Sequence, residues 1–184
     1  MSINQDVSVY VSGQLGKQVG NGECFTLADE ALQKAKAKSA SDYGKITANA
    51  DYRWGNAVNL QKLIPGDIIQ FRDYKVTITT VTKTRKTKSG GGWEEETSTQ
   101  TQTESRPHHT AIVGSVGKNG IVSVFEQNVG TGSGKRKTQK NTLYFKTYKE
   151  PESVKTKGKT TVTVNKSVKV DGKFWLYRPQ PNKP

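Results

Sequence analysis

The residues whose types and order suit covalent thiol chemistry are Cys24, His109, Glu126 and Asn128. Cys24 is the single cysteine, and it follows a glycine-rich turn at the start of a helical pattern. The histidine, the carboxylate and the amide come later, in that order. A thiol becomes a good nucleophile when a base lowers its pKa and a further polar group holds that base in one orientation. The order therefore predicts a nucleophile, a general base and two orienting groups.

A helix over residues 23–38 would place Cys24 at its N-terminus. The apolar residues recur at the three- and four-residue steps of an amphipathic helix: Phe25, Ala28, Leu32 and Ala35. The free N–H groups and the positive dipole end of such a terminus stabilise a thiolate, and the N–H of Cys24 could bind an oxyanion. Gln18 and Asn21, just upstream, are candidates for an additional oxyanion or substrate donor.

Two paired strands would bring His109 and Glu126 together. Apolar runs over 110–116 and 121–126 are joined by Gly-Lys-Asn-Gly, and Asn-Gly favours a hairpin turn. The end of the second strand then returns beside the start of the first, next to the histidine. Because side chains alternate along a strand, His108 is expected to point to the opposite face.

The rest of the pattern predicts an α+β fold, in which an N-terminal helix packs on an antiparallel sheet. Val7–Val11 alternate as a short strand or an extended arm would, and residues 56–63 suit a short helix. Further strands are expected at residues 67–71, 143–145 and 174–177. At 184 residues, the chain is expected to form one domain over 1–184.

Two Thr/Lys-rich segments are expected to extend this sheet: a hairpin insertion at about 75–106 and a basic β extension at about 146–170. In the second segment, residues 160–164 and 167–170 are the expected hairpin strands. A disordered polar loop is the alternative for the first segment.

The charges of the first segment suggest its register. A turn centred between two glycines, Gly90 and Gly91, would place Lys86 opposite Glu95 and Arg85 opposite Glu96. Such pairs of opposite charge favour the register by a few tenths of a kcal/mol each, roughly.

The net charge of +13 is concentrated at one end of the chain. Residues 127–184 hold 14 Lys/Arg and 3 Asp/Glu. A basic surface attracts polyanions, including nucleic acid and anionic envelope polymers, although a solvated surface explains it equally well. No nucleic-acid motif is present, so nucleic acid is an unlikely partner. No apolar run suits a membrane span or signal peptide, and no cluster suits a metal, so neither metal nor cofactor is expected.

The motifs resemble the CHAP family of cysteine, histidine-dependent amidohydrolases and peptidases, in the papain-like superfamily. The resemblance rests on Gly20–Cys24, on Pro65–Phe71, on His109–Val113 and on Glu126–Asn128, and it spans roughly residues 12–130. It implies that Cys24 is the nucleophile, His109 the base, and Glu126 with Asn128 the orienting groups. It also implies cleavage of peptidoglycan, as an N-acetylmuramoyl-L-alanine amidase or a peptide endopeptidase. The two Thr/Lys-rich segments depart from the family pattern.

The expected function is therefore a cysteine amide hydrolase, a monomer, acting on bacterial cell-wall peptide at the envelope or outside the cell. The first alternative keeps the fold but acts on a small amide or isopeptide, or transfers the acyl group. The second is a non-enzymatic basic β module that binds polyanions, with aromatic side chains as stacking platforms.

Overall fold

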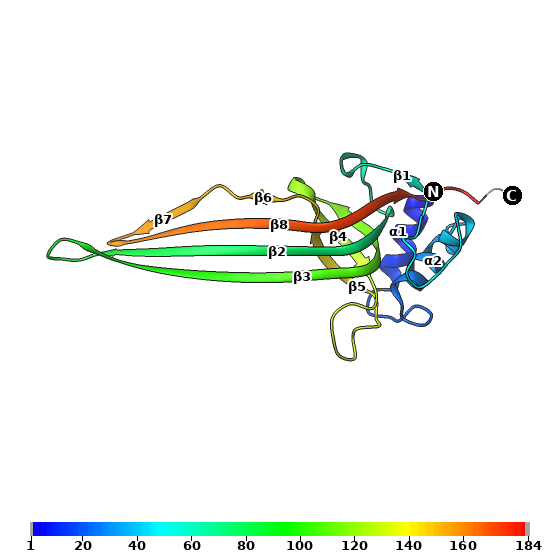
Figure 1. The fold of residues 1–184 in the computed structure, drawn as a ribbon, viewed down its shortest axis with the longest axis horizontal. Coiled ribbons are helices and arrows are strands. Elements are labelled where there is room, and N and C mark those ends of the chain that lie inside the picture. The colour runs from blue at the N-terminus through cyan, green and yellow to red at the C-terminus, as the bar shows by residue number, and fades with distance from the viewer. Residues whose placement is uncertain (1, 183–184) are drawn as a thin grey trace.

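A computed structural model describes residues 2–182 of the chain. It has a body, which holds both α-helices, and a long arm made of β-strands that run out of the body (Figure 1). The helices are α1, Ile3–Gly13, and α2, Cys24–Lys34. Short 3-10 turns lie at Ala40–Asp42, Leu60–Lys62 and Lys118–Gly120.

One antiparallel sheet contains all eight strands, and its main path runs β1-β8-β2-β3-β4-β5. The long strands are β2, Ile68–Thr87, β3, Trp93–Val116, and β8, Thr160–Arg178. The shorter strands are β1, Asn56–Ala57, β4, Ile121–Glu126, β5, Gln139–Tyr144, β6, Tyr148–Lys149, and β7, Ser153–Lys157. Strands β6 and β7 pair with the side of β8 that faces away from β2.

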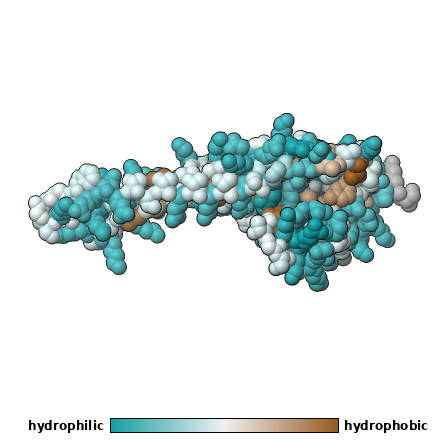
Figure 2. Space-filling view, turned by 60° about the horizontal axis from the view of Figure 1, so that its bottom comes forward, coloured by the Kyte–Doolittle hydropathy of each residue, from teal (hydrophilic) through white to brown (hydrophobic). Residues whose placement is uncertain are grey.

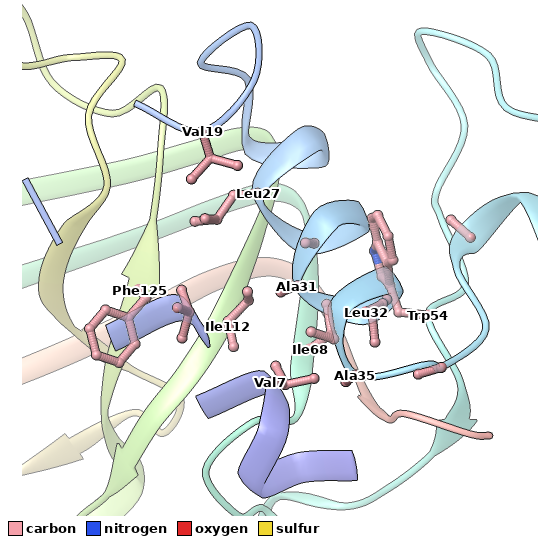
Figure 3. Packing of buried hydrophobic residues seen from close by; sticks show 14 residues of the cluster. Val7, Val19, Leu27, Ala31, Leu32, Ala35, Trp54, Ile68, Ile112 and Phe125 are labelled. Atoms are coloured by element: carbon pink, nitrogen blue, oxygen red, sulfur yellow. The ribbon is translucent and has the colours of Figure 1, made fainter. Parts of the chain in front are cut away.

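The core of the body lies between the two helices and the sheet. Figure 3 shows buried side chains from all three parts: Val7 of α1, Leu27 and Leu32 of α2, and Ile68 and Ile112 of the sheet. Val11 of α1 belongs to the same cluster and is also fully buried. A second cluster on the sheet continues along β2 and β8 as far as Val76 and Val168. Beyond it, the arm has mainly hydrophilic surface (Figure 2).

The Pro-Gly-Asp turn before β2 fixes the start of the sheet to α1 and β8. The buried carboxylate of Asp67 accepts hydrogen bonds from Asn4 at 2.9 Å and from Arg178 at 2.9–3.0 Å. Gly66 has φ +84°, and a Cβ there would lie 2.2 Å from the carbonyl oxygen of Asn4. Only glycine allows this close approach of turn and helix.

The body and the arm meet at a backbone irregularity. Asp73 has φ +52°, and the pairing of β2 with β8 shifts by one residue between Arg72 and Lys75. Opposite it on β3, Pro107 interrupts the pairs between Arg106 and His108. The alternation of faces therefore changes here on both strands, as at a β-bulge.

Several sequence predictions are wrong in detail. Val7–Val11 belong to α1 because Ser2 and Gln5 form a capping box, and because Val7 and Val11 are one helical turn apart. Residues 56–63 form β1 and a 3-10 turn rather than a helix.

The predicted hairpin within residues 160–170 is also wrong, because these residues lie in one uninterrupted strand. The turn lies earlier, at Gly158, whose φ of +59° suits the first central position of a two-residue hairpin turn. In the first segment, the β2–β3 hairpin is present, but Arg85 pairs with Glu95, one residue from the predicted register.

The predicted fold class, α+β with an N-terminal helix packed on the sheet, is wrong as well. The structure is dominated by antiparallel strands, with two 11-residue helices at one end. The Thr/Lys-rich segments cause the difference, because they do not form separate hairpins beside the sheet. They lengthen its central strands β2, β3 and β8.

Candidate active site

Cys24 is the first residue of α2, with Glu23 at the N-cap. The thiol is partly buried. Burial raises the pKa of Cys24, but the hydrogen bond and charge of His109 and the N–H groups of Thr110 and Phe25 lower it, and the net shift is downward. The environment therefore favours the thiolate, the nucleophilic form.

His109 on β3 lies between Cys24 and Glu126. Its Nε2 is 3.0 Å from Oε2 of Glu126, which is the last residue of β4 and has no solvent exposure. Since Nε2 is engaged there, Nδ1 is the nitrogen left for the thiol. Burial lowers the pKa of His109, but hydrogen bonds to Cys24 and Glu126 and their charges raise it to about 9. Together, the lowered pKa of Cys24 and the raised pKa of His109 favour the thiolate–imidazolium form of the pair over the neutral form.

Arg106, which the sequence analysis did not single out, holds the carboxylate of Glu126. Its guanidinium donates two hydrogen bonds to Glu126, at 2.6 and 2.9 Å, and its side chain is almost fully buried. Burial raises the pKa of Glu126, but Arg106 and His109 lower it to about 2. Regular alternation would place Arg106 and His109 on opposite faces, and the irregularity at Pro107 brings both to Glu126.

Two asparagines complete this polar cluster in different ways. Asn141 on β5 donates to Oε1 of Glu126 at 2.8 Å, a contact that the sequence analysis missed. Asn128, predicted to orient His109, lies in the cleft but donates to Glu23 at 2.6 Å. The structure thus brings together Cys24, His109 and Glu126, and it places Asn128 beside the helix start.

Gln127 joins the two halves of the site. Its carboxamide is buried, accepts from the N–H of Val19 at 2.8 Å and donates to the carbonyls of Val19 and Glu23 at 3.0 and 3.1 Å. The turn that carries the thiol is therefore fastened to the end of β4, which carries the carboxylate. The Glu-Gln-Asn run after an apolar strand was the only sequence signal for this contact.

The two predicted side-chain donors do not reach the cleft. Gln18 is exposed and donates to the carbonyl of Gly20 at 3.1 Å. Asn21 is also exposed, and its carboxamide oxygen accepts from the N–H of Glu23 and the hydroxyl of Thr26. Asn21 therefore helps to fix the turn that precedes α2, and neither Gln18 nor Asn21 is among the residues that line the cleft.

A cleft of about 850 Å³ opens over the thiol and the imidazole. One wall includes Tyr52 and His108, whose rings are 5.5 Å apart, and His108 bonds the carbonyl of Ala50 at 2.7 Å. At its base, the carboxamide oxygen of Gln70 accepts hydrogen bonds from Thr110 and from the indole of Trp54. The cleft is wide enough for a peptide-sized substrate.

Within residues 2–182, no group of three or more His, Cys, Asp or Glu side chains is arranged so that it could hold a metal ion. In the same range, no helix has the length and apolar character needed to cross a membrane.

Comparison with known proteins gives one family. Residues 2–182 match the family described as AIM3/BBC1 cysteine proteinase-fold domain. No curated protein and no solved structure matches the chain significantly. The match supports the papain-like fold inferred from the motifs, but not specifically a CHAP domain. Cys24 and His109 line the cleft, and Glu126 contacts His109. Because the match covers nearly the whole chain, the protein belongs to the AIM3/BBC1 cysteine proteinase-fold family.

Proposed function

We propose that this protein is a cysteine hydrolase of peptide amides, with Cys24 as nucleophile, His109 as acid and base, and Glu126 as the group that orients His109. The observation that carries the proposal is the buried 3.0 Å contact between His109 and Glu126, which holds an imidazolium beside a thiol of lowered pKa. A cysteine that only fills space in a core does not require a charged imidazole held beside it by a carboxylate.

In the proposed reaction, the thiolate sulfur attacks the amide carbonyl carbon and forms a tetrahedral intermediate. The imidazolium gives its proton to the leaving nitrogen, the C–N bond breaks, and a thioester remains on Cys24. Neutral His109 then takes a proton from water, and the hydroxide formed attacks the thioester carbonyl. The C–S bond breaks, which releases the carboxylic acid product and restores the Cys24 thiolate beside the His109 imidazolium. Glu126 stays ionised throughout and stabilises the imidazolium.

The oxyanion of the intermediate needs donors near the sulfur. The N–H of Cys24 is the first of α2 and has no hydrogen-bond acceptor among the described residues. It points from the positive end of the helix dipole, where a developing negative charge is stabilised. Neither Gln18 nor Asn21, the predicted additional donors, is among the residues that line the cleft.

The CHAP-like motifs support a finer substrate, a stem or cross-bridge peptide of peptidoglycan. The basic C-terminal part of the chain would favour an anionic envelope polymer around such a substrate. The cleft itself supports peptide amides in general, because its walls combine aromatic rings with carboxamide and hydroxyl groups.

The direct test is digestion of two substrates, purified peptidoglycan and unstructured casein, with fragments identified by mass spectrometry. Wild type should release fragments from at least one, and Cys24→Ala and His109→Ala should release none. Gln18→Ala is the matched control and should retain the wild-type rate, since its side chain lies outside the cleft. Equal release by wild type and Cys24→Ala would refute the proposal.

A further inference from the structure

One side of β3 has no partner strand along the arm. Strand β3 pairs with β2 from Trp93 to Ile112, whereas β4 pairs with it only from Ile112 to Val116. Among the described residues, no strand pairs with the other side of β3 between Trp93 and Glu104. In Figure 1 this edge is the lowest of the arm strands, and Figure 2, which turns it forward, shows mainly hydrophilic surface.

The hydrogen-bond pattern shows which backbone groups are free on this edge. The N–H of Lys88 donates to Gly92, and in an antiparallel ladder such pairs recur at every second residue. Even-numbered residues of β3 in the arm therefore bond β2. On the far side of β2, the N–H of Thr87 donates to Lys159, as the same pattern requires. Odd-numbered residues direct N–H and C=O outward: Thr97, Thr99, Thr101 and Thr103.

Apart from its glutamates, this edge lacks the features that usually block pairing with another chain. Edge strands are commonly protected by lysine, proline, bulges or a covering element. Residues 94–105 of β3 contain no Lys, Arg, Pro or Gly. The other side of the arm differs, because β6 and β7 cover β8 there, and β7 has only five residues and carries Lys155 and Lys157.

The free edge leads directly into the cleft. Glu104, Ser105, Arg106 and Pro107 continue β3 from the arm, and all four line the cleft in which His109 lies. A strand paired with the arm would therefore run on toward the thiol without leaving β3.

We infer that the free edge of β3 from Glu96 to Glu104 binds an extended, basic segment of a polypeptide substrate as an additional β-strand and leads it to Cys24. The substrate role of that segment rests on the proposed function. Main-chain hydrogen bonds to the odd-numbered threonines would provide the affinity, as in other additions of a strand to a sheet edge. The inference favours an extended polypeptide over the short peptides of a cell wall.

The charge of the partner follows from the two ends of the edge. Glu96 and Glu104 are exposed, lie on the same face eight residues apart, and are not neutralised as their neighbours are. Glu94 and Glu95 have cations at 2.7 and 3.0 Å, while Glu104 has only Arg106 at 3.7 Å. Basic side chains at matching positions of an added strand would pair with them.

A second copy of this chain is a poor occupant of the same edge. In a symmetric antiparallel pair centred on Gln100, Glu96 of each copy would lie directly opposite Glu104 of the other. Like charges directly opposite each other destabilise a strand pair, and this arrangement has two such pairs. The glutamates therefore admit a basic partner and oppose self-association.

The test uses the full chain with Cys24→Ala and a fluorescein-labelled probe, Lys-Thr-Val-Thr-Val-Thr-Val-Thr-Lys, whose lysines match the glutamate spacing. Fluorescence anisotropy should show binding, and a twin probe with glutamate at both ends should bind about ten-fold more weakly. Thr99→Pro removes an outward N–H and should weaken binding of the lysine probe by about ten-fold. Hydrogen exchange should show new protection at the odd-numbered threonines.

Two further variants keep the backbone intact. Reversing both charges, Glu96→Lys with Glu104→Lys, should exchange the preference between the two probes. Glu152→Lys, the same change on the covered side of the arm, should leave the affinity unchanged.

Equal binding of the lysine probe by the Cys24→Ala chain with and without Thr99→Pro, or protection only outside β3, would overturn the inference. A dimer in analytical ultracentrifugation that Thr99→Pro dissolves would also overturn it, because the occupant would then be a second copy. Alkylation of Cys24 in the wild-type chain separates the two proposals. Probe binding on the edge combined with an ordinary, slow thiol would refute the hydrolase and leave the docking edge in place.

Discussion

Replacing Glu126 by glutamine should reduce the reactivity of the Cys24 thiol, although Cys24 itself is not changed. The carboxylate accepts a hydrogen bond from His109 at 3.0 Å inside the protein, where neither group has appreciable solvent contact. A hydrogen bond to a charged group contributes about 1.5–3 kcal/mol. At 1.36 kcal/mol per pKa unit, its loss should lower the pKa of His109 from about 9 by about one to two units.

The same free energy stabilises the thiolate–imidazolium pair relative to the neutral pair. Glu126→Gln should therefore reduce the equilibrium constant between the ion pair and the neutral pair by about 10- to 100-fold, and iodoacetamide alkylation at pH 7 should become slower. The pH at which alkylation reaches half its maximum should rise correspondingly. The assay is alkylation followed by mass spectrometry between pH 5 and about 10, a range that brackets the usual thiol pKa.

Loss of stability has to be separated from loss of the charge. In Glu126→Gln, Arg106 stays buried and Glu104, at 3.7 Å, is its one remaining carboxylate partner among the described residues, so the free energy of unfolding should fall by about 3 kcal/mol. Adding Arg106→Gln removes the unpaired charge and should recover part of that stability, but not the reactivity. An unchanged pH profile of alkylation in a folded Glu126→Gln protein would refute the reasoning.

Three shorter predictions concern the same site and the arm. Nuclear magnetic resonance titration should give His109 a pKa near 9 in the wild type and a lower one in Cys24→Ala, because the thiolate is one cause of the shift; equal values would contradict this. Glu126 has a folded pKa of about 2, below its unfolded value, so its stabilisation is complete above about pH 4.5 and is lost as pH falls toward 2; urea unfolding should show a smaller acid loss in Glu126→Gln. Gly172→Ala should lower the unfolding free energy by more than about 1 kcal/mol, because φ is +88° and a Cβ would lie 2.1 Å from a backbone oxygen, whereas Gly134→Ala should change it little in the same urea assay.

The central residues of the site could be predicted because short-range rules determine their positions. The helical spacing after Cys24 sets the helix start, and the four-residue turn 117–120 fixes which ends of two strands meet. That turn brings the end of β4 back toward His109, which lies beside Glu126.

Arg106 and the direction of Gln18 could not be predicted in this way. Strict alternation assigns Arg106 to the wrong face, and only the irregularity at Asp73 and Pro107, which spans two strands, reverses it. The direction of the Gln18 side chain depends on the path of the loop before α2. That loop is held by a hydrogen bond to Gln127, which lies more than 100 residues later in the chain. The helix α1 was missed because Val-Ser-Val-Tyr-Val fits two periods, and the cap at Ser2 decides between them.

The position of β8 determines the order in which this molecule can be completed. It is the last strand in chain order, yet it lies inside the sheet, between β1 and β2, and Arg178 at its end bonds Asp67 at the start of β2. Contacts this far apart along the chain form slowly, and a chain emerging from a ribosome gains them only after residues 160–178 are exposed. Until then, β2 and β3 would form a hairpin with two open edges. Strand β8 closes one of them, and the edge of β3 stays available to another polypeptide.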